Sequence, residues 1–229
     1  MMLIVSLYLY DSLVLLYCNE GILIPAGRKW KIQFGLREPR ILGKELYLPA
    51  PHIPHRPLFR LTWQFEGDTR PAKTEDWEAI RDAPWALVLP VWSMAAALFV
   101  LLPLGFFTTL GHGMLLAAIS LLYVSIAAAL GYLWRHRSDL RLTGRQVAKF
   151  AFEYLICPPF ALNVIRTISA GRKFGEDLVS AARRTQDAGQ WAATRDQLLR
   201  RLDEEIELEE AGSQRGAGMR THRLQLMEQ

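Results

Sequence analysis

The residues best suited to chemistry lie in one short segment in the second half of the chain. Glu153 precedes Cys157 by four residues, and Pro158 and Pro159 follow the cysteine directly. In a membrane enzyme that acts on lipid or on a lipid-linked substrate, Cys157 or Glu153 would carry the chemistry. A Cys-Pro dipeptide also ligates haem in some proteins, although the dipeptide alone is a weak signal.

Two histidines in a proline-rich segment are a weaker candidate, in this case for a metal site. His52 and His55 have the H-x-x-H spacing that some metal sites use, but no cysteine or third ligand lies near them in residues 49–57. The sequence contains no P-loop, Rossmann glycine pattern, serine elbow or metalloprotease motif. We therefore expect no catalytic residue, no metal site and no cofactor, and we favour a protein that is not an enzyme.

An uncharged stretch dominates the chain: the 52 residues from Ala83 to Trp134 include no Asp, Glu, Lys or Arg. A helix needs about 20 apolar residues to cross a hydrocarbon core of about 30 Å. The stretch supplies two such lengths, which a turn-forming run at residues 108–113 separates. It therefore predicts a transmembrane hairpin over residues 84–134. The alternative is a buried helical hairpin in a soluble protein.

Basic residues follow the second predicted span and set its orientation. They are Arg135, Arg137, Arg141, Arg145 and Lys149. Because cytoplasmic flanks of membrane spans are enriched in Lys and Arg, we expect both termini in the cytoplasm and contact between these residues and anionic lipid head groups. Membrane contact then explains the net charge of +4, and we expect no nucleic-acid binding. The two cysteines would be free thiols on the reducing side. The 21 arginines against 6 lysines hint at a bacterial source, and hence at the inner (plasma) membrane.

Alternating apolar and polar residues before the hairpin predict a small antiparallel β module over residues 1–65, on the cytoplasmic side. Residues 59–65 alternate most clearly, and residues 5–10 alternate as well. The alternative is an extra membrane span over residues 3–18. In that span Asp11 would lie at the centre, at a cost of about 3 kcal/mol.

Two further segments are expected to lie at the membrane surface. Residues 66–83 are predicted to form a linker and a short interfacial helix that begins near Thr74. Residues 135–170 combine the basic run with an apolar segment that the proline pair interrupts, which favours two short interfacial or re-entrant helices. Cys157, Pro158 and Pro159 would there offer a docking place for a partner or a lipid. The alternative is a bent segment that only seats the tail on the membrane.

The C-terminal part is predicted to be a helical cytoplasmic tail. Residues 171–211 have the periodicity of amphipathic helices, with Trp191, Leu198 and Leu202 on one apolar stripe. The stripe would either dock a partner or pack against the same chain. Residues 212–229 are expected to be mobile.

Together these elements predict an α+β membrane protein: a two-helix transmembrane hairpin with an N-terminal antiparallel β module and a C-terminal helical tail. We expect a non-catalytic accessory or scaffold subunit of an inner-membrane protein complex, with other membrane subunits as its partners. The first alternative is a transporter or channel component that acts as a homo-oligomer, with Ser120, Tyr123 and Ser125 as the polar groups of its second span. The second alternative is the membrane enzyme described above.

Overall fold

The computed structural model describes residues 1–27, 29–63, 85–109, 111–172, 174, 176–209 and 213–228. Contacts divide the chain into two compact units, each built from separate pieces of sequence. Unit 1 comprises Met1–Val14, Leu48–Pro57 and Asp76–Gly171, and unit 2 comprises Leu15–Tyr47, Leu58–Glu75 and Arg172–Gln229. The first 65 residues therefore contribute to both units instead of forming one continuous module.

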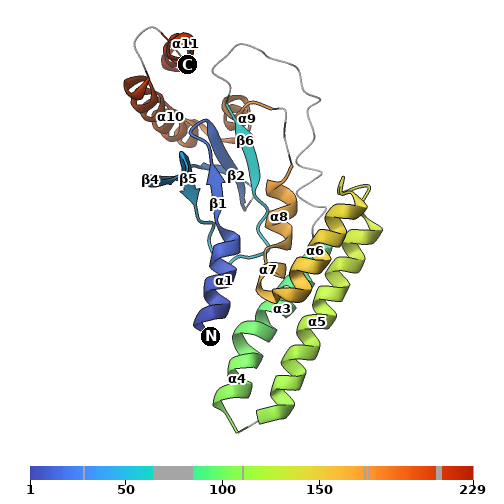
Figure 1. The fold of residues 1–229 in the computed structure, drawn as a ribbon. Helices are drawn as coiled ribbons and strands as arrows, with labels where there is room; N and C mark the ends of the chain where they lie inside the picture. Colours follow the sequence, from blue (N-terminus) through green and yellow to red (C-terminus); the bar gives the residue numbers. More distant parts are fainter. Residues whose placement is uncertain are drawn as a thin grey trace. The chain divides into compact units, whose positions relative to one another are not determined.

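Two long apolar helical segments form a hairpin in unit 1. The first comprises α3 (Trp85–Ala96), η1 (Ala97–Leu101) and α4 (Leu102–Phe107), and the second is α5 (Gly111–Arg135). Figure 1 shows the two segments lying side by side. Each is long and apolar enough to cross a membrane. The predicted pair of long apolar helices is therefore present.

Proline explains the change of helix type within the first segment. In η1 the N–H of Leu102 donates to the carbonyl of Ala97, five residues earlier, as in a π-helix. Pro103 has no N–H, and its ring would clash with the carbonyl of Phe99 in a regular α-helix. The wider π turn accommodates the ring at this point. The segment therefore continues past the proline instead of ending there.

The described residues of unit 1 form four shorter helices as well: α1 (Met2–Ser12), α6 (Gly144–Ile156), α7 (Pro158–Ala161) and α8 (Val164–Ala170). In Figure 1, α6 lies along α5, and α7 contacts both α1 and α6. Buried side chains from all four helices and from the hairpin form one apolar core. The helices predicted on either side of Pro158 are present.

The prediction of a strand at residues 5–10 was wrong, because this segment belongs to α1. Tyr8 and Ser12 are the buried residues of α1, and their spacing of four places them on one helix face. Nearly all other positions are apolar or aromatic, so the helix has no polar face, and the alternation of residue types resembled that of a strand. The alternative of a span over residues 3–18 is also wrong. The 11 residues of α1 extend only about 16 Å, and β1 follows.

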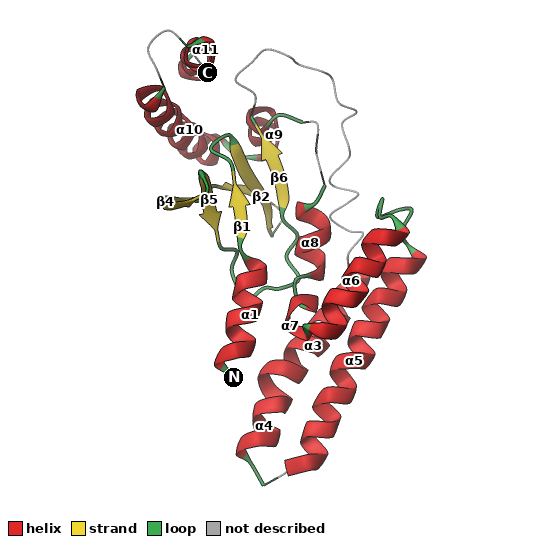
Figure 2. Ribbon diagram, in the orientation of Figure 1, coloured by secondary structure: helices red, strands yellow, loops and turns green. Residues whose placement is uncertain are grey.

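Two three-stranded sheets form the β part of unit 2 (Figure 2). Their strand orders are β1 (Val14–Leu16), β5 (Lys44–Tyr47), β4 (Leu36–Ile41) in one and β3 (Lys29–Gln33), β2 (Glu20–Ala26), β6 (Phe59–Thr62) in the other. β2 pairs antiparallel with β3 and β6, and β4 pairs antiparallel with β5. Phe59 and Leu61 are buried while Arg60 and Thr62 are partly exposed, so the predicted alternation is confirmed within β6.

Unit 2 also contains, in the part that the structure describes, the helices α9 (Leu178–Thr185), α10 (Ala188–Leu208) and α11 (Gln214–Met227). Side-chain oxygens of Asp177, Asp187 and Ser213 accept hydrogen bonds from the first backbone N–H groups of the three helices. α11 packs on α10 and buries Met219 and Leu226. Residues 214–227, within the segment that is expected to be mobile, thus form a helix with a serine cap and two buried apolar residues.

The predicted linker and interfacial helix at residues 66–83 lie outside the described residues. The boundaries predicted between the β module, the linker, the hairpin, the juxtamembrane segment and the tail stay predictions.

Candidate functional site

The five basic residues predicted to contact lipid lie together around the turn between α5 and α6. Arg135 is the last residue of α5, and Arg137 and Arg141 lie in the turn. Arg145 and Lys149 belong to the first half of α6. All five side chains are exposed. The turn therefore presents five cations near one end of the α5–α6 pair, an arrangement that suits anionic phosphate groups.

Local contacts give this turn a defined shape. The guanidinium of Arg137 lies 4.4 Å from the centre of the Trp134 ring, a cation–π contact. Arg141 adopts a left-handed backbone conformation, with φ of 51°. Thr143 and Gln146 then form a capping box that starts α6. The direction of the chain is thus reversed within a few residues.

Cys157, the candidate for chemistry, lies in an unfavourable place for a nucleophile. Burial raises the pKa of its thiol, so less of the reactive thiolate is present at neutral pH. Glu153 forms an ion pair with Lys149 at 3.5 Å. Pro158 is partly exposed, whereas Pro159 is buried. The geometry therefore does not favour the enzyme built on these two residues.

A buried arginine in α8 holds three segments of unit 1 together. Arg166 is only 4% exposed. Its Nη2 donates hydrogen bonds to the carbonyl oxygens of Ala50 and Ile53 at 2.7 and 2.8 Å. Its Nη1 donates to the hydroxyl groups of Tyr8 and Ser12 at 3.3 and 3.2 Å. The guanidinium thus connects α1, the proline-rich segment and α8.

Asn163 extends this buried cluster to a carboxylate. Its Oδ1 accepts hydrogen bonds from Arg166 at 3.0 Å and from Ser12 at 3.1 Å, and its Nδ2 donates to Asp11 Oδ2 at 2.9 Å. Burial raises the pKa of Asp11, while the hydrogen bond from Asn163 and the charge of Arg166 oppose the shift. This cluster was not predicted from the sequence. Its signal was an isolated charge, because Arg166 is the one charged residue between Glu153 and Arg172.

The two histidines do not converge on a metal site. His52 is exposed, whereas His55 accepts a hydrogen bond at Nδ1 from Trp92 Nε1 at 3.1 Å. Burial, together with the charges of Arg56 and Arg166, lowers the pKa of His55, which suits a neutral ring that accepts this bond. Within the described residues no three His, Cys, Asp or Glu side chains gather as metal ligands would.

The apolar stripe predicted on the tail belongs to unit 2 and faces inward. Leu198 and Leu202 of α10 are fully buried, and Trp191 is partly buried with Arg183 above its ring at 5.3 Å. The two leucines therefore pack within this chain and offer no surface to a partner. Of the two interpretations of the stripe, packing against the same chain is the one that the burial supports.

Unit 2 has its own buried charged pair. Arg201 of α10 binds both carboxylate oxygens of Glu45 at 2.7 and 2.6 Å, and it also donates to the carbonyl of Gly35 at 2.9 Å. Both side chains are almost completely buried. A Cβ on Gly35 would lie 2.6 Å from the Cβ of Glu45, so only glycine fits there. The pair therefore fixes how α10 packs on the sheet.

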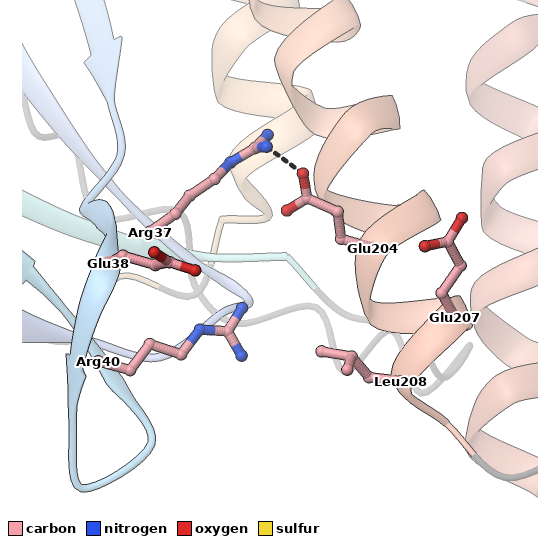
Figure 3. A pocket seen from close by; sticks show the side chains of 6 residues that line it. All are labelled: Arg37, Glu38, Arg40, Glu204, Glu207 and Leu208. Carbon is pink, nitrogen blue, oxygen red and sulfur yellow. Dashed lines mark hydrogen bonds and ion pairs between the residues drawn. The ribbon is translucent and has the colours of Figure 1, made fainter.

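An open cleft in unit 2 lies between β4 and the end of α10 (Figure 3). Arg37, Glu38, Arg40, Glu204, Glu207 and Leu208 line it. Arg37 pairs with Glu204, and Arg40 pairs with Glu205 at 2.8 Å. Both arginines of the lining are therefore engaged by carboxylates, and Glu38 and Glu207 add two further carboxylates to the cleft.

Comparison of the chain with protein-family models, with curated proteins and with solved structures found no match.

Proposed function

We propose that the protein is anchored in the bacterial inner membrane by the hairpin of unit 1, with both termini in the cytoplasm. In this proposal it acts as a non-catalytic accessory or scaffold subunit that holds unit 2 at the membrane surface, where unit 2 contacts other membrane subunits.

The exposed apolar surface of the hairpin is the observation that carries the proposal. In each of the two long helices, only 28% of the most apolar 18-residue stretch is buried within the protein. Large side chains on both helices are exposed, including Leu89 and Phe106 on the first segment and Leu116 and Val124 on the second. A helix from the core of a soluble protein buries such residues, whereas a membrane span turns them toward lipid.

The charge distribution supports the proposed orientation. The exposed cations follow Trp134 at one end of α5, and the opposite end of the hairpin, around residues 108–113, carries no charge. Cytoplasmic flanks of spans are rich in Lys and Arg. Two exposed tryptophans, Trp85 and Trp134, lie at the cationic end of the hairpin, where aromatic side chains favour the membrane–water interface.

The polar groups of the two units support a scaffold more than a catalyst. Arg166 and Arg201 each use several donors on backbone carbonyls and side chains of their own unit. Burial raises the pKa of the Cys157 thiol, which does not favour the thiolate. These groups stabilise the fold, which is what an anchoring and docking role requires.

A transport component is the second candidate, and the cluster in which Asn163 connects the buried Arg166 to the partly buried Asp11 favours it. Ionisable residues inside an apolar bundle often line transport paths. On α5, Ser125 donates to the carbonyl of Leu121 at 2.7 Å and Tyr123 donates to Leu155, so both are engaged within the protein. Flux of ions or small solutes through vesicles that hold only this protein would favour transport over the scaffold.

Purification of the tagged protein at its native expression level, in a mild detergent, tests the scaffold proposal. Mass spectrometry is expected to find one or more membrane subunits in a constant ratio to the protein. A tag-matched unrelated membrane protein is the control for non-specific recovery. A partner-free homo-oligomer that supports the cellular function, or catalyses flux alone, would contradict the proposal.

A further inference from the structure

One contact fixes how far α6 reaches along the hairpin. α6 runs back along α5, and the Tyr123 hydroxyl lies 3.5 Å from the carbonyl oxygen of Leu155 near the end of α6. Tyr123 precedes Arg135 by twelve residues, which is about 18 Å of helix. Half of a hydrocarbon core is about 15 Å. The end of α6 therefore lies level with the middle of the α5 span.

The exposed side chains of α6 change character along its length. Arg145 and Lys149, in its first half, are charged and exposed. Phe152, Leu155 and Ile156, in its second half, are 68%, 52% and 67% exposed. A helix that enters a membrane from the basic side would have the same order, with cations at the phosphates and apolar side chains below them.

The segment after α6 turns back at this depth. The 13 residues of α6 extend about 20 Å, which is too short to cross. Pro158 and Pro159 end the helix, and α7 and α8 follow in the same core. Arg166, the charged residue of this return, is hydrogen-bonded to backbone carbonyls and buried. Non-helical backbone and polar groups are tolerated below the membrane surface when protein covers them in this way.

We propose that α6 is a re-entrant helix that enters only the leaflet on the basic side, and that its exposed apolar end contacts the lipid acyl chains of that leaflet. The inference rests on the proposed insertion of the hairpin. Phe152, Leu155 and Ile156 extend the apolar surface of α5 in the same half of the membrane. The order of charged and then apolar side chains along α6 therefore fits contact with lipid.

Depth-dependent fluorescence quenching of the full chain in phosphatidylcholine–phosphatidylglycerol vesicles tests this. Cys18→Ser and Cys157→Ser remove the native thiols, and a small fluorophore is attached to Ile156→Cys or Lys149→Cys. Lipids that carry a nitroxide near the head group or near the chain end act as quenchers. Val124→Cys, at a comparable depth on α5, is the matched control within the membrane, and Glu207→Cys on unit 2 is the control in water.

The probe at 156 is expected to be quenched at least twofold more by the deep nitroxide than by the shallow one, as at 124. The probe at 149 should show the reverse order, and the probe at 207 little quenching by either. Phe152→Cys gives a second probe, with an intermediate ratio expected, if the variant at 156 does not fold. The measurement uses fewer than one protein per vesicle, so that copies of the protein do not cover one another. Quenching by the deep nitroxide at position 124 but not at positions 156 and 152 would overturn the re-entrant helix. A lack of quenching at 124 as well would overturn membrane insertion itself.

Discussion

A buried arginine in each unit has a different kind of partner. Arg201 neutralises its charge with the carboxylate of Glu45, whereas Arg166 is held by carbonyl, hydroxyl and amide oxygens, with Asp11 reached through Asn163. Removing one member of a buried ion pair leaves the other charge desolvated and uncompensated. The two sites therefore respond differently to substitution.

Glu45→Gln is expected to destabilise the protein by about 3–5 kcal/mol, because it leaves the guanidinium of Arg201 buried without an anion. Glu204→Gln is the matched control. It removes the carboxylate from the exposed pair with Arg37, which is worth at most about 1 kcal/mol. Denaturant unfolding of both variants in mild detergent measures the difference. Equal losses would show that the buried pair does not contribute as its geometry indicates.

Asp11→Asn is expected to remove a pH dependence of stability. Because burial raises the pKa of Asp11 above its ordinary value of 3.8, the fold favours the protonated carboxyl. That stabilising contribution is complete below the ordinary pKa and is lost as pH rises through the raised value. The variant should be more thermally stable than the natural protein at pH 7 to 8 and lose this advantage at low pH. A difference in melting temperature between the variant and the natural protein that stays constant from pH 4 to pH 8 would contradict this.

The buried arginines also show what residue types alone do not reveal. The sequence has 21 arginines, and those just after the second span, for which lipid contact stays a prediction, are exposed. The periodicity of α10 places Arg201, three residues after Leu198, beside the apolar stripe and Arg200 away from it, but it does not identify the partner of Arg201. Its burial depends on Glu45 and Gly35, which are more than 150 residues away in sequence.

At the scale of elements, the periodicity of the sequence predicted the helices and strands that have a clear local pattern. It failed for the helices whose local pattern is ambiguous. The long apolar helices and strand β6 were predicted because their lengths and alternation are unusual. α1 was missed because its residue types alternate as in a strand. α11 was missed because residues 212–229 include three glycines, which disfavour a helix. The Arg166 cluster depends on the meeting of three such elements, so no local pattern predicts it.

The β4–β5 hairpin contains a residue that its turn does not suit. Leu42 and Gly43 both have positive φ, 52° and 74°, in the two-residue turn between Ile41 and Lys44. Such turns favour Asn-Gly, because leucine pays about 1–2 kcal/mol in the left-handed region. Leu42 is also 92% exposed, so its side chain contributes little packing.

Leu42→Asn is therefore expected to stabilise the protein by about 1 kcal/mol. Thermal or denaturant unfolding of the full chain measures the gain. Leu42→Ala is the control, because it removes the exposed side chain without relieving the backbone. An equal gain from alanine would assign the effect to the side chain and contradict the backbone argument.

At the scale of the whole molecule, the proposed function depends on the sidedness of the hairpin. A docking role in the cytoplasm requires that residues 135–149 face the cytoplasm while residues 108–113 face the opposite side.

Labelling of single cysteines in intact bacterial cells tests this claim most directly. In a chain without Cys18 and Cys157, His112→Cys places a thiol at the uncharged turn and Ser138→Cys places one in the cationic turn; both positions are exposed. A membrane-impermeant maleimide is expected to label the thiol at 112 in intact cells and the thiol at 138 only after lysis. Labelling in the reverse order, or recovery of the protein in the soluble fraction, would contradict the account.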